Sequence, residues 1–132
     1  MKLPAIAKHI TFEKMVRISG AGNIHSDPEM AKTQGLGGVI AQGGQLTGYL
    51  SEMMTIAFGD GFLYGGEISV KFIHPVRPGD AITTGGTVVG DAATPQGRRV
   101  DCEIWIENQH GQKVVVGTAK AQQGAQQQGH RA

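Results

Sequence analysis

The imidazole of His25 is the side chain in this sequence best placed to transfer a proton. It lies in a polar stretch, residues 19–28, and a glycine-bearing segment follows that starts a long apolar helix near Gly43. Histidine gives or takes a proton near neutral pH, and the backbone N–H groups at a helix start stabilise a developing negative charge. This order of residues therefore predicts a proton-transfer group beside an amide that can hold an oxyanion.

Length and composition suit a single domain. The chain has 132 residues, a net charge of +1 and one cysteine, Cys102, which excludes an internal disulfide framework. The basic residues are scattered, which argues against nucleic acid as a partner. No apolar run approaches the roughly 18 residues needed to cross a bilayer. Residues 1–8 lack the apolar stretch of a secretory signal, so we expect a cytoplasmic protein without membrane association.

The first third of the chain predicts a strand and a short helix. Residues 10–18 alternate imperfectly between apolar and polar types, as in a strand. Asp27 followed by Pro28 is typical of a helix start with Asp27 as the N-cap, and the helix is expected over residues 29–34, ending at Gly35.

A long helix is predicted over residues 39–58. Its apolar residues recur at steps of three and four and form one stripe: Leu46, Tyr49, Leu50, Met53, Met54 and Ala57. Gly44 and Gly48 are expected to let a sheet pass close to the helix backbone. The glycines at 59 and 61 end the helix.

Four strands are predicted after the helix, over residues 67–76, 80–90, 98–107 and 113–121, with a turn at 95–97. Residues 122–132 are rich in Gln and Gly and predict a disordered tail, so the folded domain is expected to be 1–121. The fold class is therefore α+β, an antiparallel sheet wrapped around one long central helix. Because so small a sheet leaves an edge and an apolar flank open, a homodimer or a higher homo-oligomer is expected.

Several short motifs in the chain resemble the MaoC-like branch of the hot-dog-fold proteins, which includes the R-specific enoyl-CoA hydratases. The matching stretch FIHPVRPGD runs from Phe72 to Asp80, and the resemblance covers roughly residues 10 to 121. The other matching residues are Ser19, Gly20, Asn23, His25, Asp27, Ala31, Ile40, Gln42 and Gly43. The resemblance implies a single hot-dog domain and an acyl thioester substrate, carried on coenzyme A or a carrier protein, with no cofactor.

The resemblance also implies roles for individual residues. His25 would activate a water or return its proton, the N–H of Gly43 would donate to the thioester oxygen, and Asn23 would orient the water. Gln42 and Arg77 are assigned to substrate binding, with Arg77 directed to a phosphate of coenzyme A. The implied reaction is addition of water to a 2-enoyl thioester, or its loss from a 3-hydroxyacyl thioester.

The chain departs from the family pattern at its carboxylate. The catalytic Asp of the family aligns with Ala21 if the missing proline before Ile24 is treated as a deletion, and with Gly20 otherwise. Neither residue accepts a proton, so two alternatives stay open. One is a hot-dog thioesterase, although Glu52 lies about 13 Å along the helix from Gly43. The other is a non-catalytic subunit of a heteromeric dehydratase.

Structural roles are the competing interpretation for several residues. Asn23 is expected in a turn, Asp27 at a helix cap, and Tyr49 and Cys102 in the core. We expect His74 and Arg77 to be solvated at a strand end, and Asp80 to fix a turn. The five histidines show no metal-ligand spacing.

Overall fold

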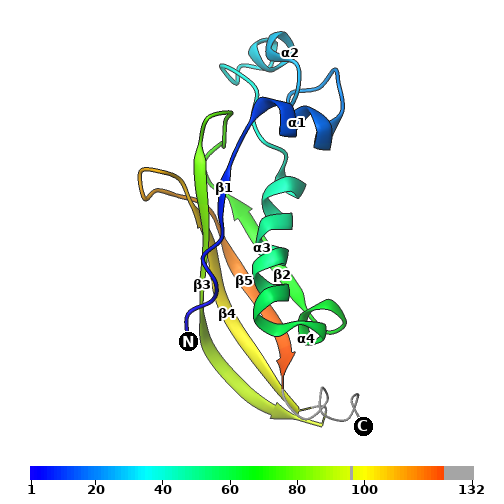
Figure 1. Cartoon of the computed structure of the whole chain (residues 1–132), viewed down its shortest axis with the longest axis vertical. Coiled ribbons are helices and arrows are strands. Elements are labelled where there is room, and N and C mark those ends of the chain that lie inside the picture. The colour runs from blue at the N-terminus through cyan, green and yellow to red at the C-terminus, as the bar shows by residue number, and fades with distance from the viewer. Residues whose placement is uncertain (96, 124–132) are drawn as a thin grey trace.

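A five-stranded antiparallel sheet lies along a long helix, α3 (Gly43–Phe58), in the computed structural model of the chain (Figure 1). The structure describes residues 1–95 and 97–123. The strands run in the order β1-β3-β4-β5-β2, with bounds β1 Ala7–His9, β2 Glu67–Phe72, β3 Ala81–Thr94, β4 Gly97–Glu107 and β5 Lys113–Gln123. The wrapped-helix architecture and the antiparallel hairpins that the sequence predicts are both confirmed.

The core lies between α3 and the facing side of the sheet. Strand β4 alternates as predicted, and its inward residues Val100, Cys102, Ile104 and Ile106 are all buried. The helix contributes Leu46, Leu50, Met53, Met54 and Phe58 to the same core. Burial of these apolar side chains is the dominant stabilising term for the domain, and it fixes which face of α3 meets the sheet.

Helix α3 begins later than its apolar pattern suggests. The structure places Gln42 at its N-cap in an extended conformation, with φ −67° and ψ 141°, and residues 39–42 lead into the helix without regular secondary structure. The prediction that Gly44 and Gly48 admit a close-packed sheet is wrong for this chain. A Cβ on Gly48 would meet nothing within 4 Å, and one on Gly44 would meet only the side chain of Gln42.

The strand predicted over residues 10–18 is instead helix α1 (Phe12–Ser19). The hydroxyl of Thr11 accepts from the N–H of Lys14, Glu13 pairs with Arg17 one turn on, and Gly20 ends the helix at φ 75°. A capping side chain and an i,i+4 ion pair stabilise a helix and not a strand. These local terms outweigh the imperfect alternation, and Met15 is the one fully buried side chain of α1.

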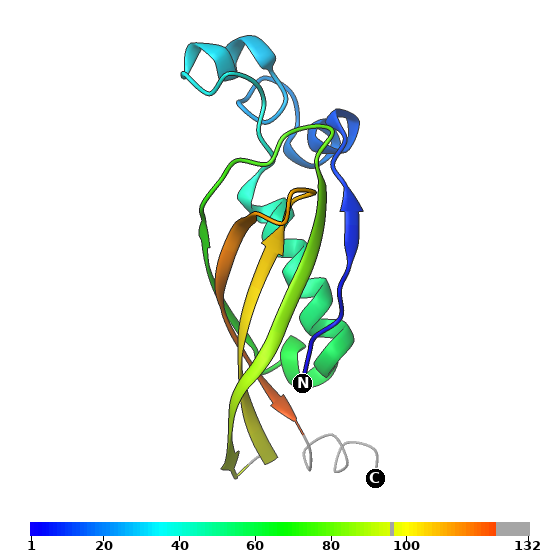
Figure 2. The same ribbon diagram turned by 90° about the vertical axis from the view of Figure 1, so that its left-hand side faces the viewer.

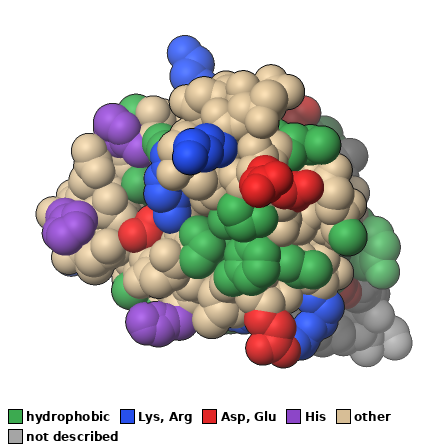
Figure 3. All heavy atoms as spheres, turned by 90° about the horizontal axis from the view of Figure 1, so that it is seen from above, with side chains coloured by type: hydrophobic (Ala, Val, Ile, Leu, Met, Phe, Trp, Pro, Cys, Tyr) green, Lys and Arg blue, Asp and Glu red, His purple; other side chains and the backbone are tan. Residues whose placement is uncertain are grey.

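Helix α2 (Pro28–Thr33) forms as predicted, with Asp27 as its N-cap. Together α1 and α2 lie at one end of the molecule, beside the N-terminal end of α3 (Figures 1 and 2). The two helices expose Phe12, Ile18 and Met30, and the view onto this end shows hydrophobic side chains gathered between acidic and basic ones (Figure 3).

The last strand extends two residues into the predicted tail. Gln122 and Gln123 pair with Arg99 and Arg98 in β5, so the prediction that disorder begins at Gln122 is wrong at these two positions. The rest of that tail, residues 124–132, and Gln96 of the predicted turn lie outside the described residues. A four-residue helix, α4 (Asp60–Leu63), follows α3. No helix in the described ranges is long and apolar enough to span a bilayer.

Candidate active site

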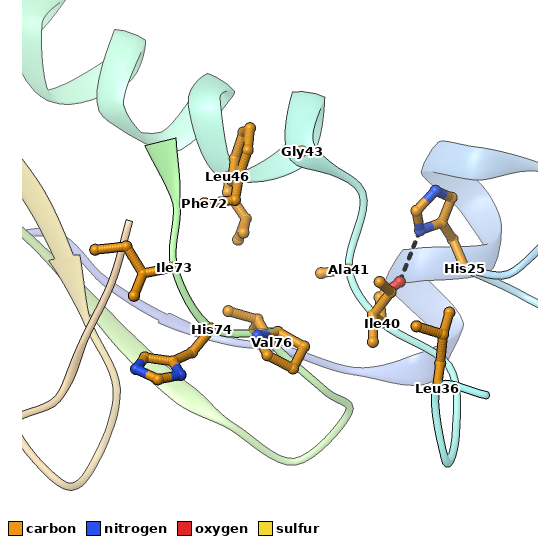
Figure 4. Close-up of a pocket in the computed structure, with 11 residues that line it drawn as sticks. His25, Leu36, Ile40, Ala41, Gly43, Leu46, Phe72, Ile73, His74 and Val76 are labelled. Atoms are coloured by element: carbon orange, nitrogen blue, oxygen red, sulfur yellow. Dashed lines mark hydrogen bonds between the residues drawn. The ribbon is translucent and has the colours of Figure 1, made fainter. Parts of the chain in front are cut away.

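A pocket of about 370 Å³ lies between the first turn of α3 and the segment that follows β2 (Figure 4). Both His25 and Gly43 line it. Its remaining walls are mostly apolar: Leu36, Ile40, Ala41, Leu46, Phe72, Ile73, Pro75 and Val76, with His74 on the side opposite His25. The structure thus brings the predicted imidazole and the predicted amide to one apolar cavity, which is a typical setting for a small-molecule site.

His25 is held in one orientation by its own loop and by the carbonyl of Ile40. Its backbone N–H donates to Oδ1 of Asn23 at 2.9 Å. Its ring Nδ1 lies 2.8 Å from the carbonyl oxygen of Ile40 (Figure 4). A carbonyl only accepts, so Nδ1 carries the proton and Nε2 of the neutral ring is left with a free lone pair. This is the tautomer that a general base requires at Nε2.

Gly43 presents an open amide at the start of α3. The carbonyl of Gln42 accepts from Gln45 and Leu46, whereas the N–H groups of Gly43 and Gly44 have no acceptor among the described residues. The first turn of α3 contains no acidic residue, and no side chain caps it. The positive end of the helix dipole is therefore uncompensated, and it favours a negatively charged oxygen bound at these amides.

The other predicted site residues do not line the pocket. Nδ2 of Asn23 donates to the carbonyl of Ser19 at 2.8 Å, and its Oδ1 accepts from His25, so this side chain shapes the loop as a turn residue. Gln42 is half-buried, and its Oε1 lies on the Gly44 side. The expectation that Arg77 is solvated is wrong, because its guanidinium is half-buried and donates to the carbonyls of Leu36 and Gly38.

Within the described chain, no Asp or Glu lines the pocket. Gly20 and Ala21, the two positions that align with the family carboxylate, are both exposed loop residues. Asp27 accepts from the N–H groups of Glu29 and Met30 at 3.0 and 3.2 Å, which confirms its role as a cap. Glu52 pairs with Lys8 at 3.0 Å away from the pocket, so it offers the thioesterase alternative no carboxylate there.

Two features of the site are not visible in the sequence. The carbonyl of Ile40 orients the imidazole, but a backbone oxygen leaves no residue-type signal. The ring of Phe72 lies against Gly43, where a Cβ would stand 2.9 Å from its Cζ. The motif FIHPVRPGD contains Phe72, but only the fold shows that it forms a wall beside the helix amide.

The described residues show neither a cluster of metal-ligating side chains nor an activated thiol. No group of three or more His, Cys, Asp or Glu side chains among them is arranged to hold a metal ion. Burial raises the pKa of the Cys102 thiol, and the negative charge of Asp101 raises it further. A buried thiol with a raised pKa is a weak nucleophile.

Comparison with known proteins identifies the family. The MaoC like domain matches residues 17–108, and the chain therefore belongs to the MaoC-like domain family. No curated protein sequence matches it significantly.

Solved structures share the fold. The R-hydratase PhaJ1 from Pseudomonas aeruginosa is 26% identical with a TM-score of 0.66, covering 94% of this chain and 81% of that one. The (R)-hydratase from A. caviae is 22% identical with a TM-score of 0.74, and the match covers 94% of this chain and 95% of that one. A chain of the ChsH1-ChsH2 complex from Mycobacterium tuberculosis is 18% identical with a TM-score of 0.75, and the match covers 93% of this chain and 96% of that one. The fold is thus the hot-dog fold of MaoC-like proteins.

Proposed function

We propose that this chain binds an acyl thioester and transfers water to or from it, as a hydratase or dehydratase. The observation that carries the proposal is the shared pocket of His25 and Gly43, with Nδ1 of the imidazole fixed on a carbonyl. Nε2 of His25 takes a proton from water as it adds to a 2-enoyl thioester, and returns one in the reverse direction. The N–H of Gly43 donates to the thioester oxygen as negative charge develops there.

General principles of enzyme catalysis set the expected contributions of the His25 base and the Gly43 amide. A positioned general base accelerates a reaction by roughly 100- to 10,000-fold. A backbone donor aimed at an oxyanion contributes about 3 kcal/mol to stabilisation of the transition state. The apolar walls of the pocket exclude water from the acyl chain and strengthen both interactions.

A hydration assay with 2-enoyl-CoA substrates, carried out on the purified chain, tests this proposal. His25→Gln is expected to lower kcat by at least about 100-fold. His110→Ala provides a matched control, because His110 is exposed and lies outside the pocket, and its turnover is expected to equal that of the wild type. Equal rates for the wild type and His25→Gln would show that the assigned base is wrong.

A second candidate function follows from the absence of a carboxylate at the pocket in the described chain. In this alternative the chain is the non-catalytic subunit of a heteromeric dehydratase and shapes the acyl site for a partner. Binding of an acyl-CoA without turnover by the purified chain would favour it, and His25-dependent turnover by the chain alone would exclude it. Release of free thiol from acyl-CoA would instead favour the thioesterase.

We also propose that the chain assembles through its sheet edges. Strands β1 and β2 form the two edges, and exposed apolar side chains stand at the end of β2, on its last residue Phe72 and on Ile73 just beyond it. Unpaired strand edges with apolar neighbours favour pairing with a second chain. Analytical ultracentrifugation is expected to show a dimer, and a monomer at assay concentration would contradict this.

A further inference from the structure

We propose that the guanidinium group of Arg77 is the positioning group of the candidate site. It fixes the segment that places His25 relative to the Gly43 amide. The catalytic consequence of this inference rests on the proposed hydratase or dehydratase function, whereas the geometry itself can be tested without turnover.

Arg77 fixes the loop that precedes the site. Its Nη2 donates to the carbonyl of Leu36 at 2.6 Å and its Nη1 to the carbonyl of Gly38 at 3.1 Å. The loop is irregular, because Gly35, Gly37 and Gly38 have φ values of 78°, 73° and 157°. Among the described residues no other donor reaches these two carbonyls. The planar fork of a guanidinium matches two acceptors held side by side.

The backbone of Arg77 is anchored before its side chain reaches across. Its N–H donates to Oδ2 of Asp80 at 2.9 Å. The same turn is bonded to Ile10, which accepts from Gly79 at 2.7 Å and donates to the carbonyl of Asp80 at 2.8 Å. Gln109 donates to Oδ1 of Asp80 at 2.9 Å. The guanidinium therefore extends from a fixed turn, so the loop it holds is fixed as well.

The held loop leads directly into the site (Figure 4). Two residues beyond Gly38, the carbonyl of Ile40 accepts from Nδ1 of His25 at 2.8 Å. Ala41 then donates to the carbonyl of Val76 at 2.7 Å, and two residues later the chain enters α3 at Gly43. The acceptor for the imidazole and the helix amide thus lie on one short segment. The helix holds one end of it and Arg77 holds the other.

Loss of this restraint has a chemical cost. Displacement of a catalytic group by about 1 Å can lower a rate by about 100-fold. Without Arg77 the glycine loop loses its two side-chain bonds, and Ile40 is placed only by its own N–H bond to Ile24 at 3.3 Å and by the bond of Ala41 to Val76. We expect the carbonyl of Ile40 then to shift, which allows the ring of His25 to take its other tautomer. Lysine does not replace the fork, because its single ammonium does not match two carbonyls in a planar arrangement.

The primary test is the tautomer of His25, measured by ¹⁵N NMR of histidine-labelled protein at mildly alkaline pH, where an ordinary imidazole is neutral. The resonances of His25 are assigned by their absence from the spectrum of His25→Gln. We expect a Nδ1-protonated ring in the wild type and a mixture of tautomers in Arg77→Lys and Arg77→Ala. An unchanged tautomer in both variants would overturn the proposal.

Kinetics give a second readout. Arg77→Ala is expected to lower kcat by about 100-fold with little change in KM, and added ethylguanidinium is expected to restore part of kcat. Arg17→Ala is the control, since Arg17 is an exposed arginine of α1 that pairs with Glu13. A rise in KM for acyl-CoA with unchanged kcat and tautomer would overturn the proposal and assign Arg77 to a substrate phosphate. If the wild type turns over no enoyl thioester, the proposed function fails and the tautomer alone decides the role of Arg77.

Discussion

The ring of Phe72 covers the first turn of α3 at Gly43. A Cβ at position 43 would stand 2.9 Å from Cζ of that ring and 3.1 Å from Cε2. The ring is 52% exposed and also lines the pocket, so it is the neighbour that must move if residue 43 gains a side chain. The Phe72 ring can therefore lie beside the Gly43 amide only because residue 43 has no side chain.

Gly43→Ala is expected to destabilise the fold by about 1 kcal/mol, because crowding of the Phe72 ring outweighs the gain from replacing a glycine in a helix. In a Phe72→Ala background the same change is expected to be neutral or stabilising. Chemical denaturation of the four proteins in this double-mutant cycle measures the coupling. Identical costs in both backgrounds would contradict the contact.

Gly48→Ala is the matched change at a helix glycine with open space around it. No atom lies within 4 Å of its added Cβ, so we expect the free energy of unfolding to rise by about 0.5 to 1 kcal/mol relative to the wild type. The same denaturation experiment measures it. A loss of stability would show instead that a second chain packs against this face of α3.

Ala21→Asp places a carboxylate at one of the two positions that align with the acid of the family, the other being Gly20. Ala21 is exposed, and no non-glycine residue in the described chain has a positive φ, so the loop accepts aspartate without backbone strain. We expect kcat for hydration to rise by at least about 10-fold, since a second proton-transfer group joins His25. Ala21→Asn is the control of similar size, and an equal rise in both variants would rule out a proton-transfer role.

Two substitutions of Asp27 distinguish a capping role from a catalytic role. Asp27→Ala is expected to lower the free energy of unfolding by about 1 kcal/mol, because the N–H groups of Glu29 and Met30 lose their acceptor. Asp27→Asn keeps a capping oxygen and is expected to match the wild type in both stability and turnover. A loss of turnover in Asp27→Asn with stability intact would make Asp27 the missing acid.

The thiol of Cys102 is expected to resist alkylation in the folded protein. Its raised pKa lowers the thiolate fraction, and burial blocks access. Because the unfolded chain loses this proton at a lower pH than the folded one, stability from this group is lost as pH rises above about 8.5, the ordinary thiol value. Denaturation at increasing pH should show a smaller decline for Cys102→Ala, and fast labelling of the native protein would contradict the burial.

The sequence predicted the sheet and the central helix well because their signals are long. Strand β4 alternates over its whole length, and the stripe on α3 repeats through several turns. The prediction failed for α1, where alternation over residues 10–18 competed with the cap at Thr11 and the pair between Glu13 and Arg17. In a segment that buries only Met15 completely, such local bonds decide the structure.

The site was predictable only where residue type and spacing mark it. The sequence indicated His25 and Gly43 through residue type and spacing, and both line the pocket. The other contacts of the site are hydrogen bonds to backbone carbonyls that only the fold brings near: His25 bonds to Ile40, and Arg77 bonds to Leu36 and Gly38. A sequence records no signal for a backbone acceptor 41 residues away from its donor.

The loop that presents His25 is built without help from position 21. Asn23 ties it to Ser19 and to the His25 amide, whereas Ala21 takes part in none of the hydrogen bonds found among the described residues. A proton-accepting group can therefore be acquired or discarded there with little effect on folding. Under the proposed function, holding a thioester and transforming it are therefore separable traits of this scaffold in evolutionary terms, and selection can alter the second while preserving the first.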